Sequence, residues 1–128
     1  LNYIKKFGHV MVQKFIPQVT KGDKRVFIIN GLVKGAIQRV PRKGSFVSNL
    51  AQGGKATKTE LNYRESKISK VVANHLKKSK IFFAGIDLVS NYLIGDINVT
   101  SPTGLKNFKD LSGINLAEDF WNNLEKLK

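Results

Sequence analysis

The chain has 128 residues, 41% apolar and 24% charged, with 22 basic and 9 acidic residues and a formal net charge of +13. This length suits one domain, residues 1–128, with a modest core. The lack of cysteine excludes disulfides, thiolate zinc sites and cysteine nucleophiles. No apolar run could cross a bilayer, and residues 1–9 lack the core of a signal peptide. We therefore expect a cytoplasmic globular protein with an anionic partner: nucleic acid, a nucleotide polyphosphate or an acidic domain.

The first third of the chain predicts strands. Residues 10–16 (VMVQKFI) and 25–29 (RVFII) are apolar runs of strand length. Asn30 and Gly31 follow, and both tolerate the positive φ of a type I′ turn. They predict a hairpin whose return strand covers residues 32 to about 40.

A polar stretch and a helix come next. Residues 41–58 are rich in Gly, Ser, Asn and Lys and show no period, so they predict a long loop, of the kind found in lids and binding loops. Thr57 and Glu60 have capping-box spacing and predict the start of a helix that ends near Lys80. Its predicted apolar side consists of Leu61, Ile68, Val71, Val72 and Leu76.

The last part predicts a second hairpin and a final helix. Residues 81–89 (IFFAGIDLV) indicate a buried strand, Ser90 and Asn91 a turn, and residues 92–99 the return strand. A helix opening near Asn115 should bury Leu116, Phe120, Trp121, Leu124 and Leu127. The fold class is therefore α+β, with antiparallel hairpins packed against two substantial helices.

The second hairpin gathers oxygen-bearing side chains. A two-residue turn at its tip would place Asp87 opposite Ile94 and Asp96 opposite Gly85. Because opposed residues share a face of the sheet, Asp87, Asp96 and Asn98 should project from the same side. Diagonal neighbours lie about 7–8 Å apart, so the two carboxylates could converge on one cation.

Two interpretations of this set remain open. Carboxylates that approach each other repel unless a cation lies between them, and Mg²⁺ prefers such oxygens. Alternatively, Asp87 is a buried, hydrogen-bonded structural residue and Asp96 lies in an ordinary edge strand.

A phosphate-binding P-loop is rejected in NLAQGGKAT, because Asn49 stands where the first glycine belongs and Ala56 where a hydroxyl must lie. Backbone N–H groups around Gly53 and Gly54 could still bind phosphate; otherwise the segment is an ordinary surface loop.

Histidine chemistry has weak support. His75 falls on the apolar stripe of the predicted helix and is expected to be a packed structural residue, and His9 has no spaced partner. Arg25 and Arg39 lie in predicted strands that are rich in apolar residues, so each requires an anion, either a structural carboxylate or that of a substrate.

Taken together, QKFIPQVTKGDKRVFIINGLV, QRVP, NLAQGGKA, IFFAGIDLV and DINVTSPTG resemble the C-terminal part of prokaryotic glutathione synthetase, an ATP-grasp ligase. The similarity runs from about Val10 to the final helix. The resemblance implies ATP-dependent ligation of glycine to γ-glutamylcysteine through an acyl phosphate, with Mg²⁺ or Mn²⁺ as the metal. It also implies that Gly95 is an insertion or bulge beside the metal site.

The resemblance also implies residue roles. For the nucleotide, it implies an adenine pocket at Gln13, Lys14 and Ile16 and a ribose contact at Asp23. For the metal, it implies Mg²⁺ ligands at Asp87, Asp96 and Asn98. For the substrates, it implies that Arg25 and Arg39 are catalytic and bind anions, and that Ser101 and Thr103 bind carboxylates. It also implies a mobile loop at about 41–58 that includes Asn49, Gly53 and Gly54.

The family enzyme is longer, so we expect this chain to be the C-terminal part of a homo-oligomeric enzyme, to need the rest of that chain, and to be inactive alone. Its partners would be ATP, γ-glutamylcysteine and glycine, with no membrane. Two alternatives remain: another ATP-grasp carboxylate–amine ligase, and a basic nucleic-acid-binding module. The second is disfavoured because the phenylalanines lie in apolar runs rather than among basic residues.

Overall fold

The computed structural model describes residues 2–10, 12, 14–43, 48, 50, 53–90 and 92–127, with the backbone alone described at 92–95. The helical elements are α1 (Asn2–Phe7), the 3-10 helix η1 (Pro17–Lys21), α2 (Tyr63–Lys78), α3 (Leu105–Ser112) and α4 (Leu116–Glu125). The strands are β1 (Asp23–Ile29), β2 (Leu32–Val40), β3 (Lys55–Lys58), β4 (Phe83–Val89) and β5 (Tyr92–Asn98). Within the described residues, no helix has the length and apolar character needed to cross a membrane.

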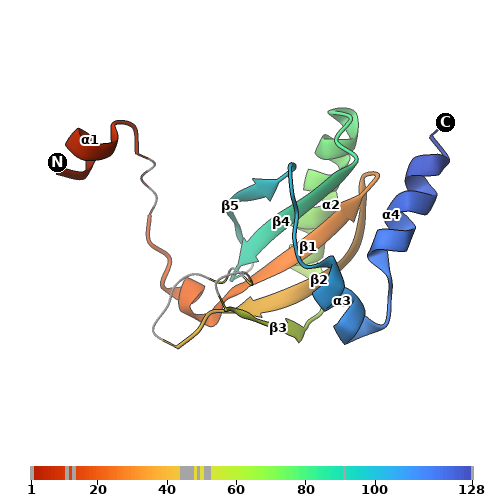
Figure 1. Ribbon diagram of the computed structural model, residues 1–128, viewed down its shortest axis with the longest axis horizontal. Helices are drawn as coiled ribbons and strands as arrows, with labels where there is room; N and C mark the ends of the chain where they lie inside the picture. The colour runs from red at the N-terminus through yellow and green to blue at the C-terminus, as the bar shows by residue number, and fades with distance from the viewer. Residues whose placement is uncertain are drawn as a thin grey trace.

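The five strands form one antiparallel sheet in the order β3-β2-β1-β4-β5 (Figure 1). Both predicted hairpins are confirmed. Ile29 pairs with Leu32 across Asn30 and Gly31, whose φ angles of 50° and 72° are those of a type I′ turn. The predicted α+β class is therefore correct.

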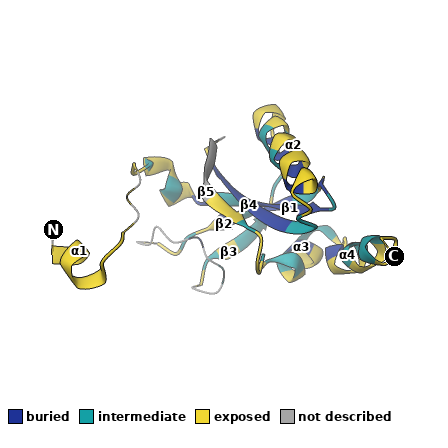
Figure 2. Cartoon of the chain, turned by 90° about the horizontal axis from the view of Figure 1, so that it is seen from above, coloured by how far each residue is buried: buried dark blue, intermediate teal, exposed yellow. Residues whose placement is uncertain are grey.

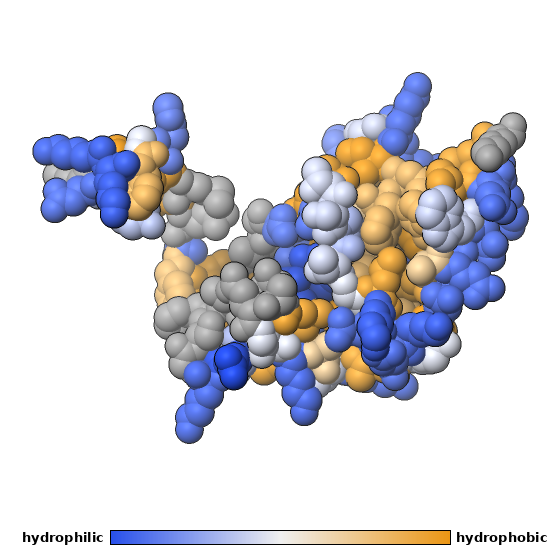
Figure 3. All heavy atoms as spheres, viewed as in Figure 1, coloured by the Kyte–Doolittle hydropathy of each residue, from blue (hydrophilic) through white to orange (hydrophobic). Residues whose placement is uncertain are grey.

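The two faces of the sheet carry separate cores, because side chains alternate along each strand. Val26, Ile28, Ile86 and Leu88 face α2 and are fully or almost fully buried. The opposite face presents Phe27, Ile29 and Ile37, which are covered by α3 and α4. Figure 2 shows β1 and β4 as a largely buried layer, with α2 on one side and α3 and α4 on the other. Figure 3 shows apolar atoms gathered between the chain that follows β5 and α4.

Helix α2 begins later than predicted. Its capping box is Asn62 and Glu65, which exchange hydrogen bonds of 2.9 and 3.0 Å between side chain and backbone. The prediction of a capping box at Thr57 and Glu60 is wrong, because Lys55–Lys58 form strand β3 on the edge beside β2. That strand also shortens the predicted loop, and Val71, predicted to be buried, is 63% exposed.

The prediction of a strand at residues 10–16 is also wrong. Of these residues the structure describes 10, 12 and 14–16, and none of them is in a strand. No described strand pairs with them, and a strand is stable only beside a neighbour. Figure 1 shows α1 set apart from the sheet at the end of this connection. Val12 is 86% and Phe15 60% exposed.

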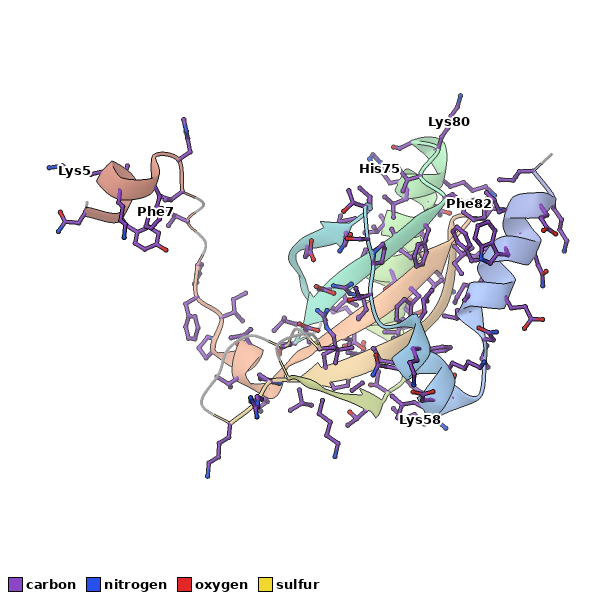
Figure 4. All side chains as sticks on the ribbon, viewed as in Figure 1. Lys5, Phe7, Lys58, His75, Lys80 and Phe82 are labelled. Atoms are coloured by element: carbon purple, nitrogen blue, oxygen red, sulfur yellow. The ribbon has the colours of Figure 1, made fainter. Side chains whose placement is uncertain are left out.

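The C-terminal helices differ from the prediction in one added element and two exposed side chains. Helix α3 was not predicted; it lies between Gly104 and Gly113, both in the left-handed conformation. Phe120 of α4 packs edge-on against Phe82 and Phe83, and Figure 4 shows Phe82 beside α4. Trp121, predicted to be buried, is 60% exposed because α4 presents only one side to the sheet, and Leu127, also predicted to be buried, is 62% exposed because it lies beyond the end of α4.

Candidate functional site

Strand register brings four charged residues together on the face opposite α2. Arg25 of β1 pairs with Asp87 of β4, and Asp23 of β1 pairs with Arg39 of β2. Directly paired residues project to the same side, as do residues two apart on one strand. The four side chains therefore form one continuous charged row across three central strands.

Asp87 lies at the centre of this row. Arg25 donates to it twice, from Nε to Oδ1 at 2.5 Å and from Nη2 to Oδ2 at 2.9 Å. Arg39 Nη2 forms an ion pair with Oδ2 at 2.7 Å, while Arg39 Nε donates to Asp23 Oδ1 at 2.6 Å. Arg25, Arg39 and Asp87 are all less than a tenth exposed. The structure thus supplies a carboxylate for each buried arginine, and removing Asp87 would take away the one that both arginines share.

The ionisation of this row reflects both burial and charge. Burial raises the pKa of Asp23, and the opposing hydrogen bond and charge of Arg39 do not fully cancel that effect. Burial alone would lower the pKa of Arg39, but the hydrogen bond that it donates to Asp23 and the charge of Asp87 raise it. Arg39 is thus a fixed cation, and an additional positive charge near the row would favour the ionised form of Asp23.

Asp96 reaches the same face by a different register from the one predicted. Gly85 pairs with Asn98 rather than with Asp96, because the β4–β5 ladder shifts between Ile86 and Leu88. This irregularity agrees with the predicted insertion or bulge at Gly95. Asp96 Oδ2 nevertheless lies 3.7 Å from Arg25 Nη2, with its side chain 56% exposed.

The row with Asp96 therefore contains three carboxylates against two guanidinium groups, a formal excess of one negative charge. Arg25 lies between Asp87 and Asp96 and is the cation that keeps their mutual repulsion in check. The structural interpretation of Asp87 as a buried, hydrogen-bonded residue is thus satisfied, while the exposed Asp96 retains capacity for a further cation.

Asn98 has a clear structural task. Its Oδ1 accepts hydrogen bonds from the backbone N–H groups of Thr100 at 3.2 Å and Ser101 at 3.0 Å, which fixes the turn after β5. A metal ligand role would require this oxygen to share or exchange these donors.

The donor set fits a hard divalent cation, because it offers carboxylate and amide oxygens and a negative charge excess. Among the described residues, no cluster of three or more His, Cys, Asp or Glu side chains is present, so a cation here would need Asn98, water or substrate oxygens as well.

The turn after β5 returns the chain across the sheet. A Cβ on Gly85 would lie 3.1 Å from Pro102 Cβ, and one on Gly104 would lie 3.1 Å from Ile37 Cδ1. Residues 102–104 therefore lie directly over β4, β1 and β2. Ser101 and Thr103 are exposed in this segment. Beside it, Arg25 Nη1 is buried without a hydrogen-bond partner among the described residues, an arrangement that costs about 1–3 kcal/mol.

The remaining predicted residues are less closely associated with the row. Lys14 and Ile16 lie before η1 and line a pocket of about 330 Å³ together with Phe15, Pro17 and Gln18. Gln13 and Asn49 are outside the described residues, as are most residues between 44 and 52 of the predicted mobile loop. Gly53 lies against Arg42, since a Cβ there would meet Arg42 Cδ at 2.9 Å.

The prediction for His75 is wrong. It is exposed on the outer side of α2 (Figure 4), while the buried positions of that helix are Glu65, Ser69, Ala73 and Leu76. The site residues that sequence reasoning missed are Gly85 and Pro102. The only signal for Gly85 was a glycine inside an otherwise apolar strand, which often marks a close approach of another group.

Comparison with known proteins identifies the class and then the family. The family model for the ATP-grasp domain of prokaryotic glutathione synthetase matches residues 2–113. The antiparallel sheet, together with α2 and α3, is thus part of an ATP-grasp domain. The chain belongs to the prokaryotic glutathione synthetase family, which confirms the resemblance seen in the motifs.

Three relatives named glutathione synthetase illustrate the similarity. Those from Prochlorococcus marinus subsp. pastoris and from Prochlorococcus marinus strain MIT 9313 are 50% and 46% identical, each over 109 residues, 85% of this chain and 35% of the relative. The relative from Bradyrhizobium diazoefficiens is 40% identical over 116 residues, 91% of this chain and 37% of the relative. The chain spans about a third of the length of these curated relatives.

Proposed function

We propose that this chain provides the substrate- and metal-binding sheet face of a ligase that joins γ-glutamylcysteine to glycine with ATP. The observation that carries the proposal is the charged row, in which two buried arginines and three carboxylates lie on one face of an ATP-grasp sheet. The family membership and the names of the relatives support the choice of substrates.

The reaction would proceed in two steps. A carboxylate oxygen of γ-glutamylcysteine attacks the γ-phosphorus of ATP, the bond to the bridging oxygen breaks, and ADP leaves. The neutral glycine amine then attacks the acyl carbon, the nitrogen loses a proton to solvent as the amide forms, and phosphate leaves with the former carboxylate oxygen. The chain must therefore bind anions, stabilise the leaving phosphate and exclude water from the acyl phosphate.

The two arginines suit the anionic steps. Arg25 and Arg39 are held rigidly by Asp87 and Asp23, so their donors are oriented before substrate arrives. A guanidinium group provides up to five N–H donors, and Arg25 Nη1 has no hydrogen-bond partner within the described part of the chain. We assign it to bind an oxygen of the substrate carboxylate or of the transferring phosphate.

A divalent cation would be held by Asp87 and Asp96, with Asn98 as the amide donor. When bound, Mg²⁺ would neutralise charge on the phosphate oxygens of ATP. Asp96 is suited to take up such an ion because its carboxylate is half exposed and its contact with Arg25, at 3.7 Å, is longer than a hydrogen bond.

Turnover of the intact protein tests this proposal. ADP release should require Mg²⁺, γ-glutamylcysteine and glycine together, and glutathione should be identified by mass spectrometry. Turnover only with another acid and amine would replace the substrates by those of a different carboxylate–amine ligase, and absence of any turnover would overturn the proposal.

A matched pair of variants tests the metal assignment. Asp96 and Asp110 are both exposed carboxylates, at 56% and 54%, but Asp110 pairs with Lys106 on α3, away from the row. Asp96→Asn should raise the Mg²⁺ concentration needed for half-maximal rate by at least about tenfold, whereas Asp110→Asn should not. Equal effects of the two substitutions would contradict the metal role of Asp96.

A further inference from the structure

The side chain of Arg25 runs over Gly85 of β4, close to Pro102. A Cβ placed on Gly85 would lie 2.9 Å from Arg25 Cδ and 3.1 Å from Arg25 Nη1. The same Cβ would lie 3.1 Å from Pro102 Cβ. Distances of this size are shorter than ordinary contacts between carbon atoms. The space above Gly85 is therefore bounded by the side chain of Arg25 and by the ring of Pro102.

The backbone at Gly85 does not itself require glycine. Gly85 is not among the residues with positive φ, and it sits in regular pairing with Phe27 on one side and Asn98 on the other. An alanine could adopt this extended conformation without strain. The reason for glycine here is thus the space that its missing side chain leaves.

That space determines where Arg25 can point. Its Nε and Nη2 are held by Asp87, directly across from it on β4. With those two nitrogens fixed, the planar guanidinium group has one free end, Nη1, and that end lies over Gly85 beside Pro102. Arg25 is only 3% exposed, so this donor is pre-oriented and largely desolvated.

We propose that Gly85 is a positioning residue, which together with Pro102 forms a slot that holds Arg25 Nη1 free to bind an oxygen of the substrate anion. The proposal rests on the proposed function in assigning Arg25 to an anion, and it adds the residues that keep this donor available. The ligand is a carboxylate or phosphoryl oxygen, because a charged N–H donor that has no partner among the described residues is matched by an anionic acceptor.

The variant Gly85→Ala isolates the steric effect. Its methyl group must displace either the guanidinium group of Arg25 or the segment containing Pro102. Gly113→Ala is the control, since Gly113 ends α3 with a φ of 78° and a Cβ there would contact nothing within 4 Å. The control is expected to lose stability through backbone strain while leaving the charged row untouched.

Two measurements on the intact protein test the assignment. The first is kcat/KM for γ-glutamylcysteine, which Gly85→Ala should lower by about ten- to a hundredfold and Gly113→Ala by less than about threefold. The second is calorimetric titration with inorganic phosphate, in which Gly85→Ala should weaken the affinity by at least about tenfold relative to the wild-type protein and the control.

A double substitution separates positioning from general damage. In an Arg25→Lys background, Nη1 no longer exists, so adding Gly85→Ala should change kcat/KM by less than about threefold. A full-sized further loss in that background would show that Gly85 acts independently of Arg25 and would overturn the proposal.

The outcomes also separate this assignment from the proposed reaction. Phosphate binding that depends on Gly85, without ligase turnover, would overturn the reaction and support the slot. Equal phosphate affinity in the wild-type protein and Gly85→Ala would overturn the proposed role of Gly85, and so would the absence of phosphate binding by the wild-type protein. Both results would do so whether or not the protein shows ligase turnover.

Discussion

Asp87 and Asp96 carry the same functional group on the same face of the sheet, yet they should differ sharply in their contribution to stability. Asp87→Ala leaves two buried guanidinium groups, those of Arg25 and Arg39, without their shared carboxylate. Breaking a buried ion pair by removing one partner costs about 3–5 kcal/mol. That is a large part of the roughly 5–15 kcal/mol that stabilises a typical domain.

Asp96→Ala provides the comparison. Its side chain is 56% exposed and its contact with Arg25 is 3.7 Å long, so solvent screens most of the interaction. The expected loss is at most about 1 kcal/mol. The free energy of unfolding is measured by urea denaturation followed by circular dichroism, and the two variants should differ by more than about 2 kcal/mol. A difference below about 1 kcal/mol would refute the central structural role given to Asp87.

Three further predictions concern the parts that support the site. Asn62→Ala removes the side-chain half of the capping box with Glu65 and should lower the free energy of unfolding by about 1 kcal/mol, as measured by urea denaturation. Phe108→Ala removes a buried ring packed on the sheet and should cost about 3–5 kcal/mol in the same assay. The third prediction concerns pH. Because burial raises the folded-state pKa of Asp23, ionisation of its carboxyl group opposes folding. The free energy of unfolding of the wild-type protein, relative to that of Asp23→Asn, should therefore fall as the pH rises from below 3.8 through the raised pKa. A constant difference between pH 3 and pH 7 would contradict the direction assigned to that pKa.

Short-range signals in the sequence predicted the parts of the fold that neighbouring residues decide. Asn30 and Gly31 specify their turn through their own φ angles, so the first hairpin could be predicted without knowledge of the rest of the chain. The alternation of side chains likewise placed Asp87, Asp96 and Asn98 on one face. The predicted pairing of Asp96 with Gly85 was wrong because the β4–β5 ladder contains a bulge, which shifts the register. The alternation of apolar and polar residues along the strand does not reveal this shift.

Long-range pairing accounts for the other differences. Lys55–Lys58 have no apolar pattern of their own and form β3 because β2 offers a free edge. Trp121 lies on the expected helix, but which side of that helix meets the sheet is decided by Phe82 and Phe83, far away in sequence. The contact of Arg25 with Asp87 depends on pairing between β1 and β4, across 62 positions of chain. The slot at Gly85 depends on the return of Pro102 over the sheet, which no local signal indicates.

The transfer of a labelled oxygen tests whether the reaction passes through an acyl phosphate. γ-Glutamylcysteine would be labelled with ¹⁸O in the carboxylate that joins glycine and incubated with the intact protein, ATP, Mg²⁺ and glycine. The proposed reaction through an acyl phosphate predicts that each phosphate released carries an oxygen atom from that carboxylate. Phosphate free of label would contradict the reaction through an acyl phosphate. Label transfer at the wild-type rate in an Arg25→Lys variant would contradict the role proposed for Arg25.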